Sequence, residues 1–129
     1  MSLPGFDTLR AKHPAERATI AQLESYIETT LRRDAEAVLD DAIIEQHIPG
    51  HVNSLRQFLA ELVERGALET RFFWICPTTE GATMEAPDIG MFPSVTECSQ
   101  CGDRHVFSQR DIEVYLVPSN QIKQLIMMR

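Results

Sequence analysis

The 129-residue sequence lacks several features that define common classes of protein. No run approaches the roughly 18 apolar residues that a membrane-spanning helix needs. The N-terminus has no charged region followed by an apolar stretch and a cleavage site, so no secretory signal is expected. The three cysteines are an odd number, whereas a secreted disulfide framework normally uses an even one. We therefore expect a cytoplasmic protein, not associated with a membrane, whose thiols are reduced.

The sequence also lacks an excess of basic residues. Its net charge is -7, and residues 34–75 hold only three Lys or Arg against eight Asp or Glu. Nucleic-acid binders usually carry a basic patch, because neutralisation of phosphates supplies most of their affinity. The charge balance disfavours nucleic acid and favours a protein partner, whose identity the sequence does not name. A homodimer is also compatible with the sequence.

Motifs of common enzymes are missing as well. There is no GxSxG nucleophile motif and no phosphate-binding loop. No HxE or CxE element accompanies the CxxC pair, as zinc deaminases require. Strand-like residues flank the CxxC pair on both sides, whereas a thioredoxin-like redox motif opens a helix. The sequence therefore predicts a protein without catalytic activity.

The first half of the sequence predicts three helices. Residues 14–32 place apolar side chains at helical spacing and begin with a proline, which suits a first helical turn. A second helix is expected from an N-cap at Asp34 to the Pro49-Gly50 pair. The third, over residues 53–65, has one apolar face and ends at Gly66, a natural left-handed cap. That face consists of Leu55, Phe58, Leu59, Leu62 and Val63.

The second half predicts short strands. Residues 68–75 are rich in aromatic and branched side chains and read as a strand that runs into Cys76. Residues 77–97 contain three prolines and two glycines, which indicates a long irregular connection. Further strands are expected at 96–98, 105–107 and 111–117, and Ser119 could cap a short final helix. The sequence therefore predicts an α+β fold.

The helical block resembles a winged helix-turn-helix domain, since three helices run directly into a strand. The recurrence Leu55, Leu59, Leu62 followed by Gly66 is similar to the third helix of that fold. The resemblance implies a winged-helix-like domain over residues 14–75, preceded by a flexible N-terminus over 1–13. If the third helix read DNA, its early outward residues would reach the bases. These residues are His51, Asn53, Ser54, Arg56 and Gln57. The alternative is a solvated polar face or a face for a protein partner.

A pair of thiols is the clearest chemical signal. Cys98 and Cys101 lie in the stretch CSQCG, where the two-residue spacer lets both thiolates reach one metal ion from a tight turn. Gly102 lets the backbone curl so that amides can bond the sulfurs. Cys76 closes the aromatic strand and begins the stretch CPTTEG. Three candidate thiolate ligands are thus available for a metal ion, and we expect zinc in a structural role.

The two cysteine stretches resemble the knuckles of a zinc ribbon, and CPTTEG is similar to a knuckle of the form CPxCG. Thr79 occupies the place of its second cysteine, so the fourth ligand is missing. His105 is the first candidate to replace it, because neutral imidazole is a common zinc ligand. Glu80, Asp103, His51, a water molecule, and a ribbon that has lost its metal remain alternatives, as do cysteines packed as small apolar residues.

Together these resemblances imply a three-helix winged-helix-like block followed by a small antiparallel β zinc-ribbon-like region and a short C-terminal helix over 76–129. The element order is similar to that of the alpha-subunit family of transcription factor E, whose members act as adaptors. We therefore expect a non-enzymatic protein-interaction module with a structural zinc or a degenerate zinc site. The alternatives are a DNA-binding transcriptional regulator that uses the third helix and a metal-dependent enzyme with an open coordination position.

Overall fold

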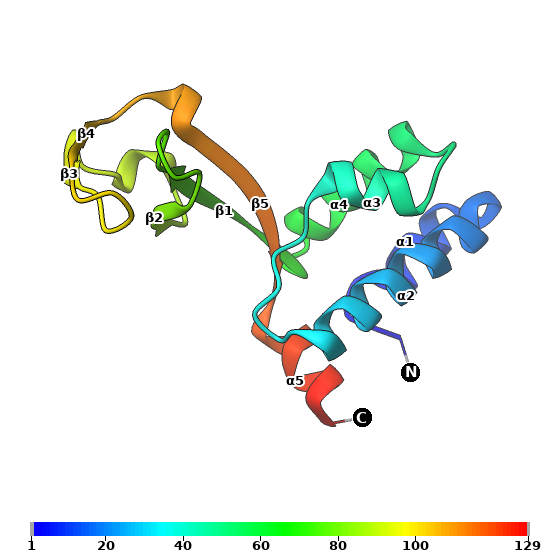
Figure 1. The fold of residues 1–129 in the computed structure, drawn as a ribbon. Helices are drawn as coiled ribbons and strands as arrows, with labels where there is room; N and C mark the ends of the chain where they lie inside the picture. The colour runs from blue at the N-terminus through cyan, green and yellow to red at the C-terminus, as the bar shows by residue number, and fades with distance from the viewer. Residues whose placement is uncertain (1, 129) are drawn as a thin grey trace. The chain divides into compact units, whose positions relative to one another are not determined.

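The computed structural model describes residues 2–128 and is an α+β fold, as the sequence predicts (Figure 1). Its helices are α1 (Phe6–Lys12), α2 (Arg17–Arg33), α3 (Asp41–His47), α4 (Val52–Glu64) and α5 (Asn120–Met128). Its strands are β1 (Leu68–Ile75), β2 (Ala82–Ala86), β3 (Val95–Glu97), β4 (Arg104–Val106) and β5 (Ile112–Pro118). Among the described residues, no helix is both long and apolar enough to cross a membrane.

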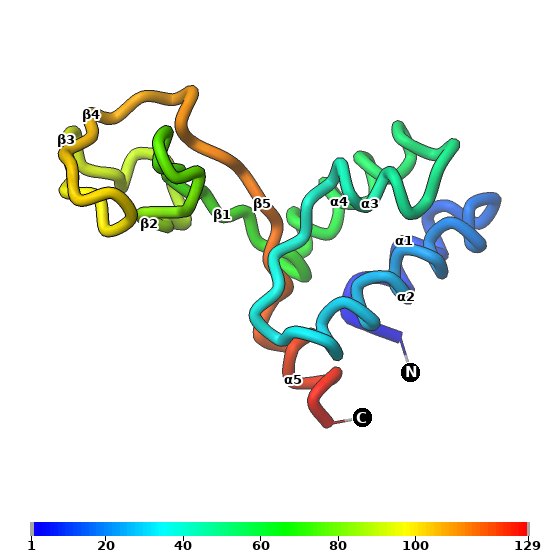
Figure 2. Tube along the Cα trace, viewed as in Figure 1, coloured from blue at the N-terminus to red at the C-terminus, as the bar shows by residue number. Residues whose placement is uncertain are grey.

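The chain forms two compact units. The first holds the residues up to Glu69 together with those from Leu116 onward, and the second is Thr70–Tyr115. Figure 2 shows the path of the chain through β1, which leaves the first unit, and β5, which returns to it. Residues 70–115 are therefore an insertion within the sequence of the helical unit. This division differs from the predicted one, which places a single boundary between residues 75 and 76.

The helical unit has a continuous apolar core. Helix α2 packs against α1 and α5, while α4 packs against α1 and α3. The predicted third helix is confirmed as α4, whose apolar face is buried from Leu55 to Leu62, and Gly66 follows with a φ of 76°. The core cluster contains 18 buried side chains, all of them in this unit. A core of this size can hold the helices together without help from the inserted residues.

The predicted second helix begins later than expected. Leu39 and Leu116 form an isolated antiparallel bridge, in which the N–H of Leu39 donates to the Leu116 oxygen at 2.6 Å. This pairing requires extended backbone at Leu39, so the helix cannot start at Asp34. It begins instead at Asp41, and the carboxylate of Asp40 caps it by accepting from the N–H of Ala42 at 2.9 Å. The later start of the helix thus has a non-local cause, because the residue that pairs with Leu39 lies 77 positions away in the sequence.

Helix α1 lies where the sequence predicts a flexible N-terminus over residues 1–13. Phe6 and Leu9, one turn apart, are both buried in the core. The segment after α1 is tied to α4 by Glu61, a buried carboxylate that pairs with Lys12 and lies 2.9 Å from Nε2 of His13. The Lys12–Glu61 ion pair, the contact of His13 with Glu61 and the buried apolar side chains hold the N-terminal segment on the helical unit.

The inserted unit is built from antiparallel strands. Strand β1 lies between β2 and β5 in one sheet, and β3 pairs with β4 in a second. The two short predicted strands lie one residue earlier than expected, with Thr96 opposite His105. Trp74 is fully buried, and its ring meets those of Phe92 and Phe107 edge to face. The hydrophobic side chains buried in this unit are only Trp74, Cys76, Ala86 and Cys98.

Substitution of Glu61 by Gln should destabilise the helical unit by about 1–3 kcal/mol at neutral pH, because it removes a buried charge from its partners. Lys12 first, and then His13, lower the pKa of Glu61 below its ordinary value of 4.5. The stabilisation is therefore present above that value and is lost as the pH falls through the lowered pKa. Urea unfolding followed by far-UV circular dichroism at pH 7 and pH 3 should show a difference between the proteins that shrinks in acid.

Glu64→Gln, an exposed position on the same helix, is the matched control and should leave stability within about 0.5 kcal/mol of the wild type. Equal effects of the two substitutions at pH 7 would contradict the role assigned to Glu61.

Candidate metal centre

Three thiols and one imidazole converge in the inserted unit. The Sγ atoms of Cys76, Cys98 and Cys101 and a ring nitrogen of His105 all lie within 4.8 Å of one another. Nε2 of His105 is 3.2 Å from the Sγ of Cys101 and 3.5 Å from that of Cys76. Cys76 and Cys98 are buried, and the other two residues are half-buried. Residues from three places in the sequence are thus brought to one point.

The spacing of these atoms suits a small tetrahedral cation. Bonds of about 2.0 Å to nitrogen and 2.3 Å to sulfur place tetrahedral ligand atoms about 3.3–3.8 Å apart. The distance of 3.5 Å from Nε2 of His105 to the Cys76 sulfur falls within this range, and that of 3.2 Å to the Cys101 sulfur falls just below it. No other group of three or more His, Cys, Asp or Glu residues with such proximity is found among residues 2–128. The donor set of three sulfurs and one nitrogen is one that binds soft or borderline metal ions.

The two cysteine turns have the same backbone hydrogen bonds. In the first turn, the N–H of Cys76 donates to the oxygen of Gly81, and the N–H of Glu80 donates to the oxygen of Cys76, both at 2.8 Å. In the second, the N–H of Cys98 donates to the oxygen of Asp103, and the N–H of Gly102 donates to the oxygen of Cys98, again both at 2.8 Å. Every residue of the second turn lies 22 positions after its counterpart in the first.

Both turns also have one residue in the left-handed conformation at the same place. Gly102 has a φ of 80°, and its counterpart Glu80 has a φ of 63°, the only positive φ among the described non-glycine residues. A side chain in this region costs roughly 1–2 kcal/mol of backbone strain. The inserted unit retains this strain at Glu80, which indicates that the geometry of the first turn is held by its surroundings.

The first turn stabilises a thiolate. The hydroxyl of Thr79, followed by its backbone N–H, lowers the pKa of Cys76 to about 5 against the opposing effect of burial. The thiolate of Cys76 in turn raises the pKa of His105, because the imidazolium gains a negative neighbour. A thiolate available at neutral pH is the form that binds a metal ion, since a bound proton would compete for the sulfur.

The second turn treats its two thiols differently. Burial raises the pKa of Cys98, but the hydroxyl of Thr83 and the N–H groups of Cys101 and Gln100 outweigh it, so its pKa is lowered. The N–H of Gln100 lies 3.3 Å from the Cys98 sulfur. For Cys101, the backbone N–H of Asp103 favours the thiolate, yet burial and the neighbouring sulfurs raise its pKa overall. Three sulfurs so close together repel one another as thiolates, and a cation between them would remove that repulsion.

The structure brings together some of the residues that the sequence singles out and separates others. His105 joins the three cysteines, whereas Glu80, Asp103 and His51 are not part of the cluster. Thr96 faces His105 across the hairpin, and this register turns His105 towards the sulfurs while Val106 points outward and is 72% exposed. The alternation of side chains along β4 thus decides which of its residues can serve as a ligand.

The residues considered for DNA contact lie on the first turns of α4 or just before it. His51, Asn53 and Gln57 are exposed. Ser54 donates its hydroxyl to the carboxylate of Glu16 at 2.6 Å, and Arg56 pairs with Glu45 at 2.8 Å. Two of the five polar side chains are therefore already engaged by carboxylates of the same unit, which leaves them less available for a nucleic acid.

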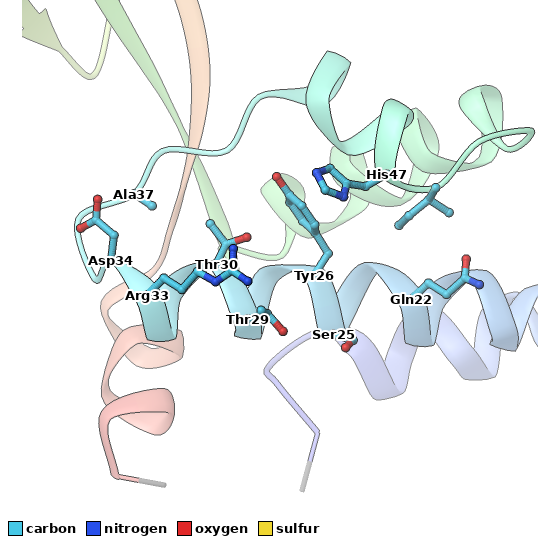
Figure 3. A pocket seen from close by; sticks show the side chains of 10 residues that line it. Gln22, Ser25, Tyr26, Thr29, Thr30, Arg33, Asp34, Ala37 and His47 are labelled. Carbon is cyan, nitrogen blue, oxygen red and sulfur yellow. The ribbon is translucent and has the colours of Figure 1, made fainter.

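The helical unit also has an open groove along α2 (Figure 3). Tyr26 and His47 meet at one part of it with ring centroids 5.0 Å apart, and Arg33 and Asp34 lie at its other end. The threonines between them, Thr29 and Thr30, add two hydroxyl groups. The lining has no excess of either charge, and no buried polar atom points into it without a partner among the described residues. The groove therefore indicates no particular ligand.

Two threonines near the sulfurs have no predicted function. The sequence predicts Thr79 only as the place of a missing cysteine, and Thr83 belongs to no predicted site. The hydroxyl of Thr79 lowers the pKa of Cys76, and the hydroxyl of Thr83 lowers that of Cys98 against the opposing effect of burial. The sequence shows no obvious internal repeat, but aligning CPTTEGAT with CSQCGDRH at an offset of 22 residues would have pointed to both.

Comparison with known proteins finds no relative of the chain. No protein-family model, curated protein or solved structure matches the chain. Helices and a small antiparallel β region with a Cys3His cluster define the class of structure, which is compatible with a zinc-ribbon-like module. What the molecule does must be inferred from this geometry.

The equivalence of the two turns predicts opposite effects at the left-handed residues. Glu80→Gly should stabilise residues 70–115 by up to about 1 kcal/mol, because glycine adopts a positive φ without strain. Gly102→Ala should destabilise them by about 1–2 kcal/mol through the backbone alone, since an added Cβ would meet no atom within 4 Å. Denaturant unfolding monitored by the fluorescence of Trp74, the single tryptophan, measures both. Changes of the same sign in the two variants would contradict the equivalence.

Proposed function

We propose that Cys76, Cys98, Cys101 and His105 hold a structural zinc ion in a non-enzymatic interaction module. The observation that carries the proposal is the convergence of all four ligand atoms within 4.8 Å. A Cys3His set is a common structural zinc site, and zinc accepts both sulfur and nitrogen donors in tetrahedral geometry. The two turns add N–H and hydroxyl donors near the sulfurs, which orient the ligands and offset their charge.

The number of protein ligands supports a structural role over a catalytic one. A catalytic zinc keeps one position open for water or substrate, whereas a structural zinc is closed by four protein ligands. Here a fourth donor, Nε2 of His105, lies close enough to two sulfurs to share one ion with them. We therefore favour a closed site over the metal-dependent enzyme that three cysteines alone would permit.

The ion would supply much of the stability of the inserted unit. Of the four hydrophobic side chains buried there, two are the proposed ligands Cys76 and Cys98. Chains of this size, 46 residues, generally cannot bury enough apolar surface to fold without a metal, a disulfide or a partner. The free energy of metal binding thereby becomes free energy of folding.

The helical unit supports a winged-helix-like platform in this proposal. Its element order is α2, the extended Leu39, α3, α4 and then β1, and Leu39 pairs with Leu116 at the start of the returning chain. The inserted residues leave along β1 and return along β5, at the place where a wing would turn. We propose that the module binds a protein partner.

A zinc determination on protein purified without chelator should find one ion per chain. Cys98→Ser should remove it, because a serine hydroxyl does not replace a thiolate at neutral pH. His105→Ala should weaken zinc binding at least about tenfold, since a water molecule must replace the imidazole. Competition with a chromophoric chelator, followed by absorbance, gives the affinities.

His51→Ala is the matched control, because this histidine is exposed and lies outside the cluster. It should bind zinc like the wild type. Purified wild-type protein that takes up no zinc would overturn the proposed function, and equal losses from His51→Ala and His105→Ala would overturn the ligand assignment.

A DNA-binding regulator is the second candidate, favoured by the exposed Asn53 and Gln57 at the start of α4. Against it stand the acidic charge and the engagement of Arg56 by Glu45. We expect fluorescence anisotropy with a mixed duplex to show no binding whose affinity falls with salt between about 50 and 200 mM. Salt-dependent binding that Asn53→Ala and Gln57→Ala abolish would reverse the order of the two candidates.

A further inference from the structure

Position 79 in the first cysteine turn corresponds to the ligand Cys101 in the second. Thr79 is three residues after Cys76, as Cys101 is three residues after Cys98. The backbone hydrogen bonds that define the two turns are the same in partners and in length, at 2.8 Å each. The residues that follow, Glu80 and Gly102, share the left-handed conformation. Position 79 is therefore the structural counterpart of a ligand position.

The residue seven positions after each first cysteine reaches the opposite turn. His105, seven after Cys98, places Nε2 at 3.5 Å from the sulfur of Cys76. Thr83, seven after Cys76, accepts at its hydroxyl from the N–H of Ser99 at 3.4 Å. The equivalence thus extends from the turns into the strands that follow them. The ligand set departs from this equivalence at two pairs: the ligand Cys101 corresponds to Thr79, and the ligand His105 corresponds to Thr83.

We propose that His105 supplies the fourth ligand in place of position 79, the geometric counterpart of Cys101, and that a cysteine at position 79 can supply that ligand instead. This inference rests on the proposed zinc site and deepens it. Thr79 is not in the ligand set, and its hydroxyl accepts from the N–H of Gly81 at 3.4 Å. A cysteine at position 79 would restore two ligands to the first turn and make His105 dispensable.

A histidine and a cysteine as fourth ligand give the metal site different net charges. Zinc with three thiolates and a neutral imidazole carries a net charge of about -1, whereas zinc with four thiolates carries about -2. The inserted unit already has seven Asp or Glu against three Lys or Arg. The ligand His105 therefore reduces the negative charge in a unit that is acidic. Thr79 is exposed, so its replacement by cysteine disturbs no packed side chain.

The test is recovery of metal binding by a second substitution. Cobalt(II) serves as the probe, because its absorption reports both tetrahedral geometry and the number of bound thiolates. His105→Ala should lose at least about tenfold in cobalt affinity. The double variant Thr79→Cys/His105→Ala should return to within about tenfold of the wild type, with thiolate-to-cobalt absorption about one third stronger because four sulfurs replace three.

Thr78→Cys/His105→Ala is the matched control, since it adds a cysteine next to the proposed position. It should stay as weak as His105→Ala. Far-UV circular dichroism and Trp74 fluorescence verify that each variant is folded. Recovery of cobalt affinity by both double variants, or by neither, would overturn the inference about position 79. In either case, the proposed function would still stand if the wild type binds cobalt.

The single variant Thr79→Cys separates the remaining outcomes. If the wild type binds no cobalt and Thr79→Cys binds one ion, the proposed function is overturned and the geometric role of position 79 is supported. If neither protein binds cobalt, both proposals are overturned.

Discussion

The convergence of three sulfurs and one imidazole is the interaction on which the account of residues 70–115 depends. These residues bury little besides Trp74, Ala86 and two of the converging cysteines. Short strands alone do not stabilise such a segment, because a two-stranded sheet such as β3–β4 is marginal in water. Without an ion, the three thiols would repel one another as thiolates or pack as small apolar groups. With one, they would become the centre that joins the two cysteine turns.

The helical unit follows a different logic. Its 18 buried apolar side chains supply a conventional hydrophobic core, and the ion pair of the buried Glu61 with the exposed Lys12 fixes the segment after α1. The two units are therefore stabilised by different physical terms although one chain runs through both. An insertion of this kind can change in sequence and in charge without affecting the platform, provided that β1 and β5 continue to leave and re-enter it.

Much of the fold could be predicted from local sequence patterns. The elements that were predicted wrongly depend on contacts between residues far apart in the sequence. The apolar face and terminal glycine of α4 follow from spacing alone. The start of α3 does not, because the bridge between Leu39 and Leu116 holds the preceding residues extended. The N-terminal helix is short, and only the buried surfaces of α2 and α4 explain why Phe6 and Leu9 form part of the core. The insertion of one unit into the other is equally invisible to a reading along the chain.

The candidate site was predictable in its chemistry and only partly in its geometry. The spacing of Cys98 and Cys101 and the CP dipeptide at Cys76 pointed to the three thiols. His105 was one of several candidates, and the register of β3 against β4, not its residue type, turns it towards the sulfurs. The positions of Thr79 and Thr83 depend on hydrogen bonds within two equivalent turns whose sequences differ.

The most direct test of this account is to remove the metal and record which amides lose protection. Hydrogen exchange on the protein before and after treatment with a strong chelator should show that residues 70–115 exchange freely without the ion. The amides of α2 and α4 should keep their protection, because their core does not depend on it. Unchanged protection throughout the inserted unit after complete removal of metal, or loss of protection in both units together, would contradict the account.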